Sequence, residues 1–359
     1  MLNVGMLTSG GDCQALNAAI RGVAKTLYHY YDDVVIYGFT DGYRGLMKKE
    51  FRVMTERDFS GILNIGGTIL GTSRTQYKYI NEPLEDGSDK LESMINTYKE
   101  LNLDCLVILG GNGSHKTADL LRRNGLNIIT LPKTIDNDLE GTSVSFGFNS
   151  ALEIATNAID RIHTTAASHS RVFILELMGH KTGWLTLHAG IAGGADIILI
   201  PELPYDINVV IDAITKRTEQ GKKFTIIAMA EGALSEEEAA MTKKQRKTTW
   251  KEDGFPSPAF RLGSRITAIT GQEVRVTVPG HVQRGGEPSA YDRVLATRLG
   301  VEAARLIVNS QFGLMVCADN DQISTIPLEE VAGKTKLVNP ECQLIRQAED
   351  LGICLGQNV

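Results

Sequence analysis

The sequence lacks several features that define large classes of protein. No apolar run approaches the roughly 18 residues of a membrane-spanning helix, and the amino terminus has neither a charged leader nor a cleavage site. The five cysteines form no CxxC pair and show no ligand spacing with histidines, which argues against a zinc site and against a disulfide framework. These absences predict a cytoplasmic protein with reduced thiols and no membrane partner.

The chain also lacks an excess of positive charge, since its 359 residues carry a net charge of -6. An acidic protein is poorly suited to wrap a polyanion, so we expect no nucleic-acid partner. The sequence contains no G-x-x-x-x-G-K-[ST] run, which excludes a P-loop, and its glycine turns do not match G-x-G-x-x-G. Any phosphate must therefore be bound by another arrangement.

Short β-branched runs alternate with longer helical patterns along almost the whole chain. The runs are nearly continuous in apolar residues, as in parallel strands covered on both faces, and the helices between them indicate βαβ units. We therefore predict an α/β fold with doubly wound, mainly parallel sheets. The predicted strands are Val4–Leu7, Val34–Phe39, Cys105–Leu109, Asn127–Leu131, Arg171–Leu177, Ile197–Ile200, Phe224–Ala230 and Glu273–Val278.

Two glycine turns each follow a predicted strand and precede a helical pattern. Gly10–Gly11 leads into the pattern Leu16–Tyr28, and Gly110–Ser114 leads into the pattern Lys116–Arg123. Backbone N–H groups in such turns, together with the helix terminus behind them, favour phosphate oxygens. Each turn alone could equally serve chain packing, because Gly-Gly turns are common.

A polar loop, Pro132–Asp138, follows the predicted strand Asn127–Leu131, where open α/β sheets bind ligands. It places a lysine, a hydroxyl and two carboxylates within seven residues, a set that suits proton abstraction beside a charged group. The alternative is an Asx-rich turn, since Asn and Asp favour turns in general.

Four arginines occur beside glycines or at strand ends, where they could bind phosphate through two hydrogen bonds. They are Arg74, Arg171, Arg275 and Arg284. A single arginine in such a place is more often part of a salt bridge. Four of them, with two glycine turns and a paired-carboxylate loop, fit phosphoryl transfer between two phosphorylated ligands.

Taken together, the motifs resemble those of the 6-phosphofructokinase family and occur in that family's order between roughly residues 4 and 300. They are Thr8–Asp12 with Leu16–Gly22, Gly110–Ser114, Pro132–Asp138, Met178–Gly179 and Gly280–Gly286. The resemblance implies a glycolytic enzyme that uses ATP and Mg²⁺ to phosphorylate the 1-hydroxyl of fructose 6-phosphate.

The resemblance also implies the domain organisation. Two Rossmann-like domains are expected: residues 1–147 with about 283–335 would bind the nucleotide, and residues 148–282 with about 336–359 would bind the sugar phosphate. A homodimer or homotetramer is expected, with an active site shared between subunits.

By the same resemblance, Asp136 is the base, Thr134 and Arg171 stabilise the transferring phosphoryl group, and Asp138 supports the metal through water. The other expected substrate contacts are Met178, Gly179, His180, Glu231, His281, Arg284 and, from a neighbouring subunit, Arg275. Arg171 is a second contact that a neighbouring subunit could supply. The expected ATP contacts are Gly11, Arg74, Gly111, Asn112, Gly113 and Ser114.

The chain departs from the family's usual pattern at positions that concern the donor. Asn112 replaces an aspartate near the metal, which predicts weaker metal binding because an amide carries no charge. Lys133 is typical of pyrophosphate users, whereas Gly113 leaves room for the α-phosphate of a nucleotide. This combination resembles an ATP-dependent branch close to the pyrophosphate enzymes. A pyrophosphate-dependent enzyme and a noncatalytic phosphosugar or nucleotide sensor remain the alternatives.

A further departure is His180, which stands where the family commonly has an arginine after Met178-Gly179. A histidine can still lie near a sugar phosphate, but it is only partly charged at neutral pH.

Overall fold

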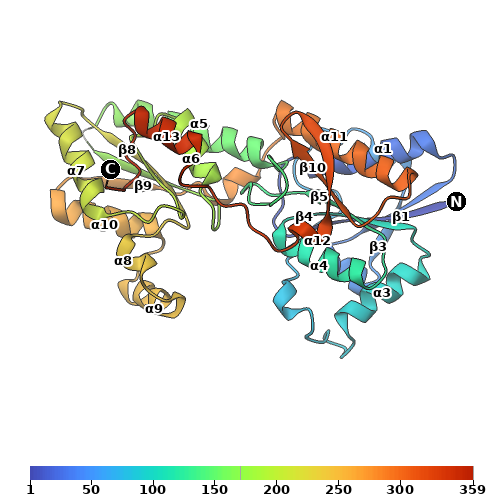
Figure 1. Cartoon of the computed structure of the whole chain (residues 1–359). Coiled ribbons are helices and arrows are strands. Elements are labelled where there is room, and N and C mark those ends of the chain that lie inside the picture. The colour runs from blue at the N-terminus through green and yellow to red at the C-terminus, as the bar shows by residue number, and fades with distance from the viewer. Residues whose placement is uncertain (170, 359) are drawn as a thin grey trace. The chain divides into compact units, whose positions relative to one another are not determined.

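The computed structural model describes residues 1–169 and 171–358 and divides into two compact units (Figure 1). Unit 1 comprises Met1–Ser150 and Arg284–Lys336, and unit 2 comprises Ala151–Gln283 and Leu337–Val359. The chain therefore passes from one unit to the other three times, and neither unit is a single continuous stretch of sequence.

Unit 1 is built on a seven-stranded sheet in the order β11-β10-β5-β4-β1-β2-β3. Its strands are β1 (Leu2–Ser9), β2 (Val34–Phe39), β3 (Phe51–Met54), β4 (Cys105–Gly110), β5 (Ile128–Pro132), β10 (Leu314–Asp319) and β11 (Gln322–Pro327). The five strands from β10 to β2 run parallel, and the two edge strands β3 and β11 are antiparallel to their neighbours. The central strands are continuous apolar runs because helices cover both faces of the sheet.

The helices of unit 1 lie on both sides of this sheet (Figure 1). They are α1 (Leu16–Tyr30), α2 (Tyr43–Lys48), α3 (Lys90–Glu100), α4 (Asn112–Arg123), α11 (Ala290–Val308) and α12 (Leu328–Val331), with short 3-10 turns at Glu56–Phe59 and Tyr77–Tyr79. Helices α1 and α11 pack closely at Gly22 and Gly300. A Cβ atom at Gly300 would lie 2.4 Å from the carbonyl oxygen of Ala19, so only glycine permits this approach.

Unit 2 is built on a four-stranded parallel sheet in the order β7-β8-β6-β9. Its strands are β6 (Val172–Leu177), β7 (Ile197–Leu199), β8 (Thr225–Ala230) and β9 (Val274–Thr277). Its helices are α5 (Phe148–Ala166), which begins in unit 1, α6 (Trp184–Ala192), α7 (Ile207–Glu219), α8 (Glu236–Ala239), α9 (Lys243–Asp253), α10 (Pro258–Thr270) and α13 (Gln343–Asp350). A 3-10 turn, η3, covers Gly280–Arg284.

The predicted α/β class with mainly parallel sheets is confirmed. All eight predicted strands are present, and their ends agree within two residues. The sequence analysis missed strand β3 and the antiparallel pair β10 and β11. The five cysteines are free, as expected from their spacing. Across residues 1–169 and 171–358, the structure contains no helix with the length and apolarity required to cross a membrane.

Candidate active site

The strand order of unit 1 places the two glycine turns next to each other. From β1 the chain moves outward to β2 on one side of the sheet, whereas β4 and β5 lie on the other side, so the order reverses between β1 and β4. The residue paired with Ser9 at the end of β1 is Gly110 at the end of β4. Ligands of doubly wound sheets bind in the crevice at such a reversal, outside the carboxyl ends of the strands.

The turn after β1 is held by the segment that carries Arg74. Gly10 has a φ of 88°, which favours glycine. The Gly10 amide donates to the carbonyl oxygen of Ser73 (3.0 Å), and the Thr72 hydroxyl donates to the carbonyl oxygen of Gly10 (2.7 Å). Arg74 follows directly and is exposed. The predicted nucleotide contacts Gly11 and Arg74 are therefore brought together within unit 1.

The turn after β4 runs straight into α4, which begins at Asn112, so Gly113 and Ser114 lie in its first turn. The amides of a first turn have no partner within their own helix and can bind an anion. Gly113 is exposed, and a Cβ atom placed on it would meet no atom within 4 Å. The protein itself therefore leaves room for a side chain at this position.

Lys133 joins the polar loop to the first glycine turn. Its side-chain ammonium is buried and donates to the carbonyl oxygen of Gly11. Burial lowers the pKa of Lys133 to about 8, and the nearby guanidinium of Arg284 acts in the same direction. The neighbouring thiol of Cys13 is also buried, which raises its pKa to about 12.

Arg284, predicted to contact the sugar phosphate, lies in unit 1 over the glycine turn. Its Nη1 atom donates to the carbonyl oxygen of Asp12 (2.9 Å), and a Cβ atom on Gly11 would approach this Nη1 atom to 2.9 Å. Its Nε atom is buried and has no hydrogen-bond partner among the residues that the structure describes. The guanidinium is thus positioned by the backbone beside the turn and keeps a donor available.

The polar loop after β5 is a tight turn held by local hydrogen bonds. Thr134, which is 8% exposed, accepts a hydrogen bond from the Asp136 amide at its hydroxyl (3.1 Å), and its carbonyl oxygen accepts one from the Ser145 hydroxyl (2.8 Å). Asn137 is in the left-handed region, with a φ of 51°. The carboxyl groups of Asp136 and Asp138 belong to half-buried residues on either side of it. The loop is therefore a turn in which Asn137 adopts the left-handed conformation, as the Asx-rich alternative expects, and it still carries both carboxylates.

A segment that the sequence analysis missed lies against this loop and against Asn112. The Asn112 side-chain amide donates to the carbonyl oxygen of Lys334 (2.9 Å) and to the hydroxyl of Thr335 (3.0 Å). Because the side-chain nitrogen of Asn112 makes both of these bonds, the other polar atom of the side chain is the oxygen Oδ1. This oxygen is buried and has no hydrogen-bond partner in the described part of the chain. An acceptor left over in this way fits a metal ion or a metal-bound water.

In unit 2, residues predicted to bind the sugar follow the carboxyl ends of neighbouring strands: Met178, Gly179 and His180 follow β6, and Glu231 follows β8. The carboxylate of Glu231 accepts a hydrogen bond from the His180 amide (2.8 Å). Gly179 has a φ of 146°, and a Cβ atom there would lie 2.5 Å from the carbonyl oxygen of Thr182. The structure thus brings these four residues together. His281 lies in η3, after the strand β9 that is next to β6, and is exposed.

Two further residues support this part of unit 2 and were not predicted. The fully buried Gln283 accepts a hydrogen bond from the Met178 amide at 3.4 Å. Glu202 accepts from the amides of Gly183 (3.0 Å) and Val338 (2.9 Å) at one carboxylate oxygen, and burial raises its pKa. Gln283 stands in the Gly280–Gly286 motif and could have been found there, whereas nothing in the sequence marks Glu202.

Arg171 and Arg275 both form ion pairs with Glu273, a partner that the sequence analysis missed. Each arginine contacts a different oxygen of the Glu273 carboxylate. The pKa of Glu273 is lowered, mainly by the hydrogen bond from Arg171. The two arginines lie near the starts of the paired strands β6 and β9, at the opposite end of β6 from Met178–His180, so the structure does not bring them together with the other sugar-binding residues of this chain. In the absence of ligands both side chains therefore pair with the Glu273 carboxylate, and a phosphate group could take its place.

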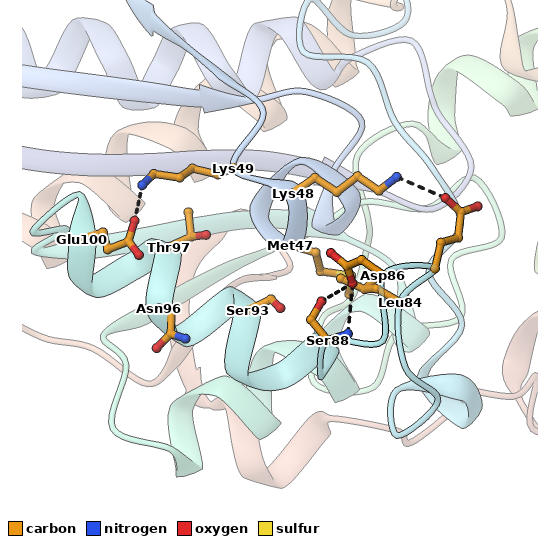
Figure 2. A pocket seen from close by; sticks show the side chains of 11 residues that line it. Met47, Lys48, Lys49, Leu84, Asp86, Ser88, Ser93, Asn96, Thr97 and Glu100 are labelled. Atoms are coloured by element: carbon orange, nitrogen blue, oxygen red, sulfur yellow. Dashed lines mark hydrogen bonds and ion pairs between the residues drawn. The ribbon is translucent and has the colours of Figure 1, made fainter.

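A separate hollow in unit 1 contains no predicted site residue. It has a volume of about 460 Å³ and lies between the end of α2 and helix α3 (Figure 2). Its lysines form ion pairs across it, Lys48 with Glu85 at 3.8 Å and Lys49 with Glu100, and Asp86 accepts hydrogen bonds from Ser88. Because these charges are paired within the hollow, it does not compete with the glycine turns as a phosphate site.

Comparisons with known proteins identify the family of this chain. Residues 3–307 match the family model described as Phosphofructokinase. The "ATP-dependent 6-phosphofructokinase" of Spirochaeta thermophila is 53% identical over 99% of this chain and 98% of its own. The "ATP-dependent 6-phosphofructokinase 3" of Bacteroides thetaiotaomicron is 46% identical over 99% of this chain and 100% of its own.

Solved structures show the same fold. Phosphofructokinase from Pichia pastoris in the T-state is 32% identical with a TM-score of 0.78, and the match covers 92% of this chain but 35% of that longer one. A pyrophosphate-dependent phosphofructokinase from Marinobacter aquaeolei matches with a TM-score of 0.80 over 99% of this chain and 92% of its own; at 22% identity this likeness concerns the fold alone. On the family model and the nearly full-length relatives, the chain belongs to the phosphofructokinase family.

Proposed function

We propose that this protein is an ATP-dependent 6-phosphofructokinase, which transfers the γ-phosphoryl group of ATP to the 1-hydroxyl of fructose 6-phosphate in glycolysis. The observation that carries the proposal is the 53% identical relative of that name, which matches along the length of both chains. The meeting of two glycine turns and a carboxylate loop at the strand-order reversal of unit 1 supports it.

The proposed chemistry needs one base and several groups that neutralise charge, because phosphoryl transfer depends mostly on positioning and electrostatics. Asp136 would accept the proton of the sugar hydroxyl, which then attacks the phosphorus atom in line with the departing diphosphate. Thr134 would hold oxygens of the transferring group. Arg171 would do the same from a neighbouring subunit, by exchanging Glu273 for phosphate, because in its own chain it precedes β6 whereas the sugar-binding residues Met178–His180 follow that strand.

Mg²⁺ is the metal that this donor set suits, since oxygen atoms are the ligands it prefers. Asp138, acting through water, and the unsatisfied Oδ1 of Asn112 would hold it beside the donor phosphates, whose charge it would neutralise. In the described part of the chain no group of three or more His, Cys, Asp or Glu side chains could hold a metal ion. Water and phosphate oxygens would therefore supply most of its ligands.

We assign the nucleotide to unit 1, through Gly11, Arg74, Gly111, Gly113 and Ser114. We assign the sugar phosphate mainly to unit 2, through Met178, Gly179, His180, Glu231 and His281, with Arg284 of unit 1. Arg275 would reach the sugar phosphate of a neighbouring subunit, which makes a homodimer or homotetramer the working form. As a glycolytic enzyme the protein would act in the cytoplasm.

Gly113 favours ATP as the phosphoryl donor, because the open space above it admits the α-phosphate of a nucleotide. Lys133 favours the alternative donor, pyrophosphate. One assay separates them: purified protein with fructose 6-phosphate and Mg²⁺ receives ATP or pyrophosphate in parallel, and fructose 1,6-bisphosphate is measured. Product formed with ATP supports the proposal. If product forms with pyrophosphate alone, the donor is pyrophosphate and not ATP. If no product forms with either donor, the proposed function is wrong.

A further inference from the structure

A short segment near the end of unit 1 lies beside the catalytic loop, although it follows the region matched by the family model, residues 3–307. Thr335 forms an antiparallel β-bridge with Leu139, and the Lys336 amide donates to the carbonyl oxygen of Asp138 (2.9 Å). Residues 334 and 335 also accept the two hydrogen bonds from the Asn112 side chain. One piece of backbone thus contacts both the proposed metal-side residue of α4 and the loop that carries the proposed base.

The side chain of Lys336 turns back into this loop. Its ammonium donates to Oδ1 of Asn137 (3.1 Å) and to the carbonyl oxygens of Thr142 (2.8 Å) and Ser143 (3.0 Å). An ammonium group has three protons and no acceptor, so it can donate to all three of these oxygens. The opposite charges of Asp138 and Glu140 also lie near enough to act on it.

Asn137 is the loop residue whose side chain accepts a hydrogen bond from Lys336. It stands between Asp136 and Asp138 in a left-handed conformation that residues other than glycine rarely adopt. Its Oδ1 atom accepts from Lys336 and from the Ser145 amide (3.1 Å), and its amide group donates to the carbonyl oxygen of Ser143 (3.4 Å). The direction in which the two flanking carboxylates leave the backbone depends on this anchored turn.

We propose that Lys336 is a positioning residue for phosphoryl transfer, which fixes the Asn137 turn and thereby aims Asp136 at the sugar hydroxyl. This inference rests on the proposed function, because it takes Asp136 as the base. The proposed role of Lys336 is exerted through Asn137 and requires no contact with a substrate. Its effect should therefore fall on turnover, since small displacements of a catalytic group reduce the rate more than they weaken binding.

The test compares Lys336→Met with Lys336→Arg, and with Lys99→Met as a matched loss of one exposed lysine in the same unit. In Lys336→Met we expect kcat to fall about 100-fold, with the KM values for fructose 6-phosphate and ATP changed less than about threefold. Lys336→Arg keeps the charge and several donors, so its kcat should be at least about tenfold higher than that of Lys336→Met. Lys99→Met should match the wild type.

A readout independent of turnover is hydrogen exchange of the backbone amides in residues 134–145. Exchange should quicken in Lys336→Met, first at Ser145, whose amide donates to Asn137. If Lys336→Met does not fold, Asn137→Gly provides the second variant, because glycine accepts the left-handed backbone while removing the side chain that Lys336 holds. It should fold and lose turnover in the same way.

The outcomes separate this inference from the proposed function. An inactive wild type would overturn the function, and unchanged hydrogen exchange in Lys336→Met would then also overturn the anchoring role. An active wild type with unchanged kcat in Lys336→Met or in Asn137→Gly would overturn the positioning role alone. A loss of kcat that Lys336→Arg does not rescue would also count against it.

Discussion

The buried ammonium of Lys133 donates a hydrogen bond to the carbonyl oxygen of Gly11, so the loop with the proposed base is tied to the turn that would cradle the donor phosphates. In the free chain this lysine is engaged with the protein backbone. The ammonium group has three protons and this bond uses one of them, so it could bind a phosphate oxygen without leaving Gly11. Lys133 would then hold a donor phosphate at a place fixed by the first glycine turn.

Replacing the proposed base should separate catalysis from binding. In Asp136→Asn we expect turnover to fall about 10²–10⁴-fold, because the amide cannot accept the hydroxyl proton, while the affinity for fructose 6-phosphate stays within a few-fold of the wild type. Steady-state kinetics and calorimetric titration would measure the two effects. Asp212→Asn, on the exposed face of α7, is the matched control. Equal turnover in Asp136→Asn would remove the base and reopen the sensor alternative.

Filling the space at Gly113 should change the donor. In the absence of ligands, the side chain of Gly113→Asp fits without a clash. Its carboxylate would occupy the space that the α-phosphate needs and would repel the negative charge of that phosphate. We expect kcat/KM for ATP to fall by about 100-fold or more, the size of effect that misplacing a reactant produces, while pyrophosphate use survives or appears. Parallel assays with both donors measure this. Gly113→Ala, which adds bulk without charge, is the control; undiminished ATP use in the aspartate variant would refute the steric argument.

A charge at position 112 should strengthen metal binding. In Asn112→Asp we expect the Mg²⁺ concentration for half-maximal activity to fall severalfold, because a carboxylate binds Mg²⁺ more strongly than an amide oxygen does. The same change removes the donors to Lys334 and Thr335, which should cost about 1 kcal/mol of stability. Magnesium titration of activity and thermal unfolding report the two effects separately. An unchanged Mg²⁺ dependence would mean that residue 112 is not a metal ligand.

Burial of Lys133 should make stability depend on alkaline pH. Its pKa is about 8 in the folded chain, below the usual value of a lysine, so between these values the unfolded chain binds more protons and the free energy of unfolding rises with pH. The gain is complete above the unfolded pKa of about 10.4, is lost as the pH falls through about 8, and amounts to about 3 kcal/mol.

Urea unfolding of the wild type and Lys133→Met between about pH 7.5 and 10.5 would test this prediction, because the variant lacks the titrating group. The wild type should gain stability relative to the variant across this interval. Parallel pH dependences would show that the lysine is not held at a lowered pKa. The comparison with the variant is needed because burial also lowers the pKa of Lys336 to about 8.

The sequence predicted those parts of the fold whose local pattern agrees with their final environment. The run Cys105–Leu109 is apolar at every position because both faces of β4 are covered, and its burial is complete. Strand β11 alternates between half-buried and exposed residues at the edge of the sheet, and β3 is only four residues long, so neither carries an equally strong signal. Strand β10 has four buried residues in succession and could have been recognised.

The polar partners of the site were harder to predict than its motifs. Glycine turns and the Pro132–Asp138 loop carry their chemistry in adjacent residues. Glu273, by contrast, looks like an ordinary strand-end carboxylate until the pairing of β6 with β9 places it between Arg171 and Arg275. Lys336 contacts Asn137 across most of the chain length, and no local pattern announces such a contact.

The threefold passage of the chain between the two units has a consequence for how the protein is made. Residues 1–150 of unit 1 leave the ribosome before unit 2 does, yet the strand β10 and the helix α11 that packs on α1 come from residues 284–336. During translation, the edge of β5 that pairs with β10 and the face of α1 that packs on α11 remain exposed while the main body of unit 2 is synthesised. The sheet of unit 2 is therefore complete before the sheet of unit 1. During this interval chaperones should bind mainly to residues 1–150 of the nascent chain.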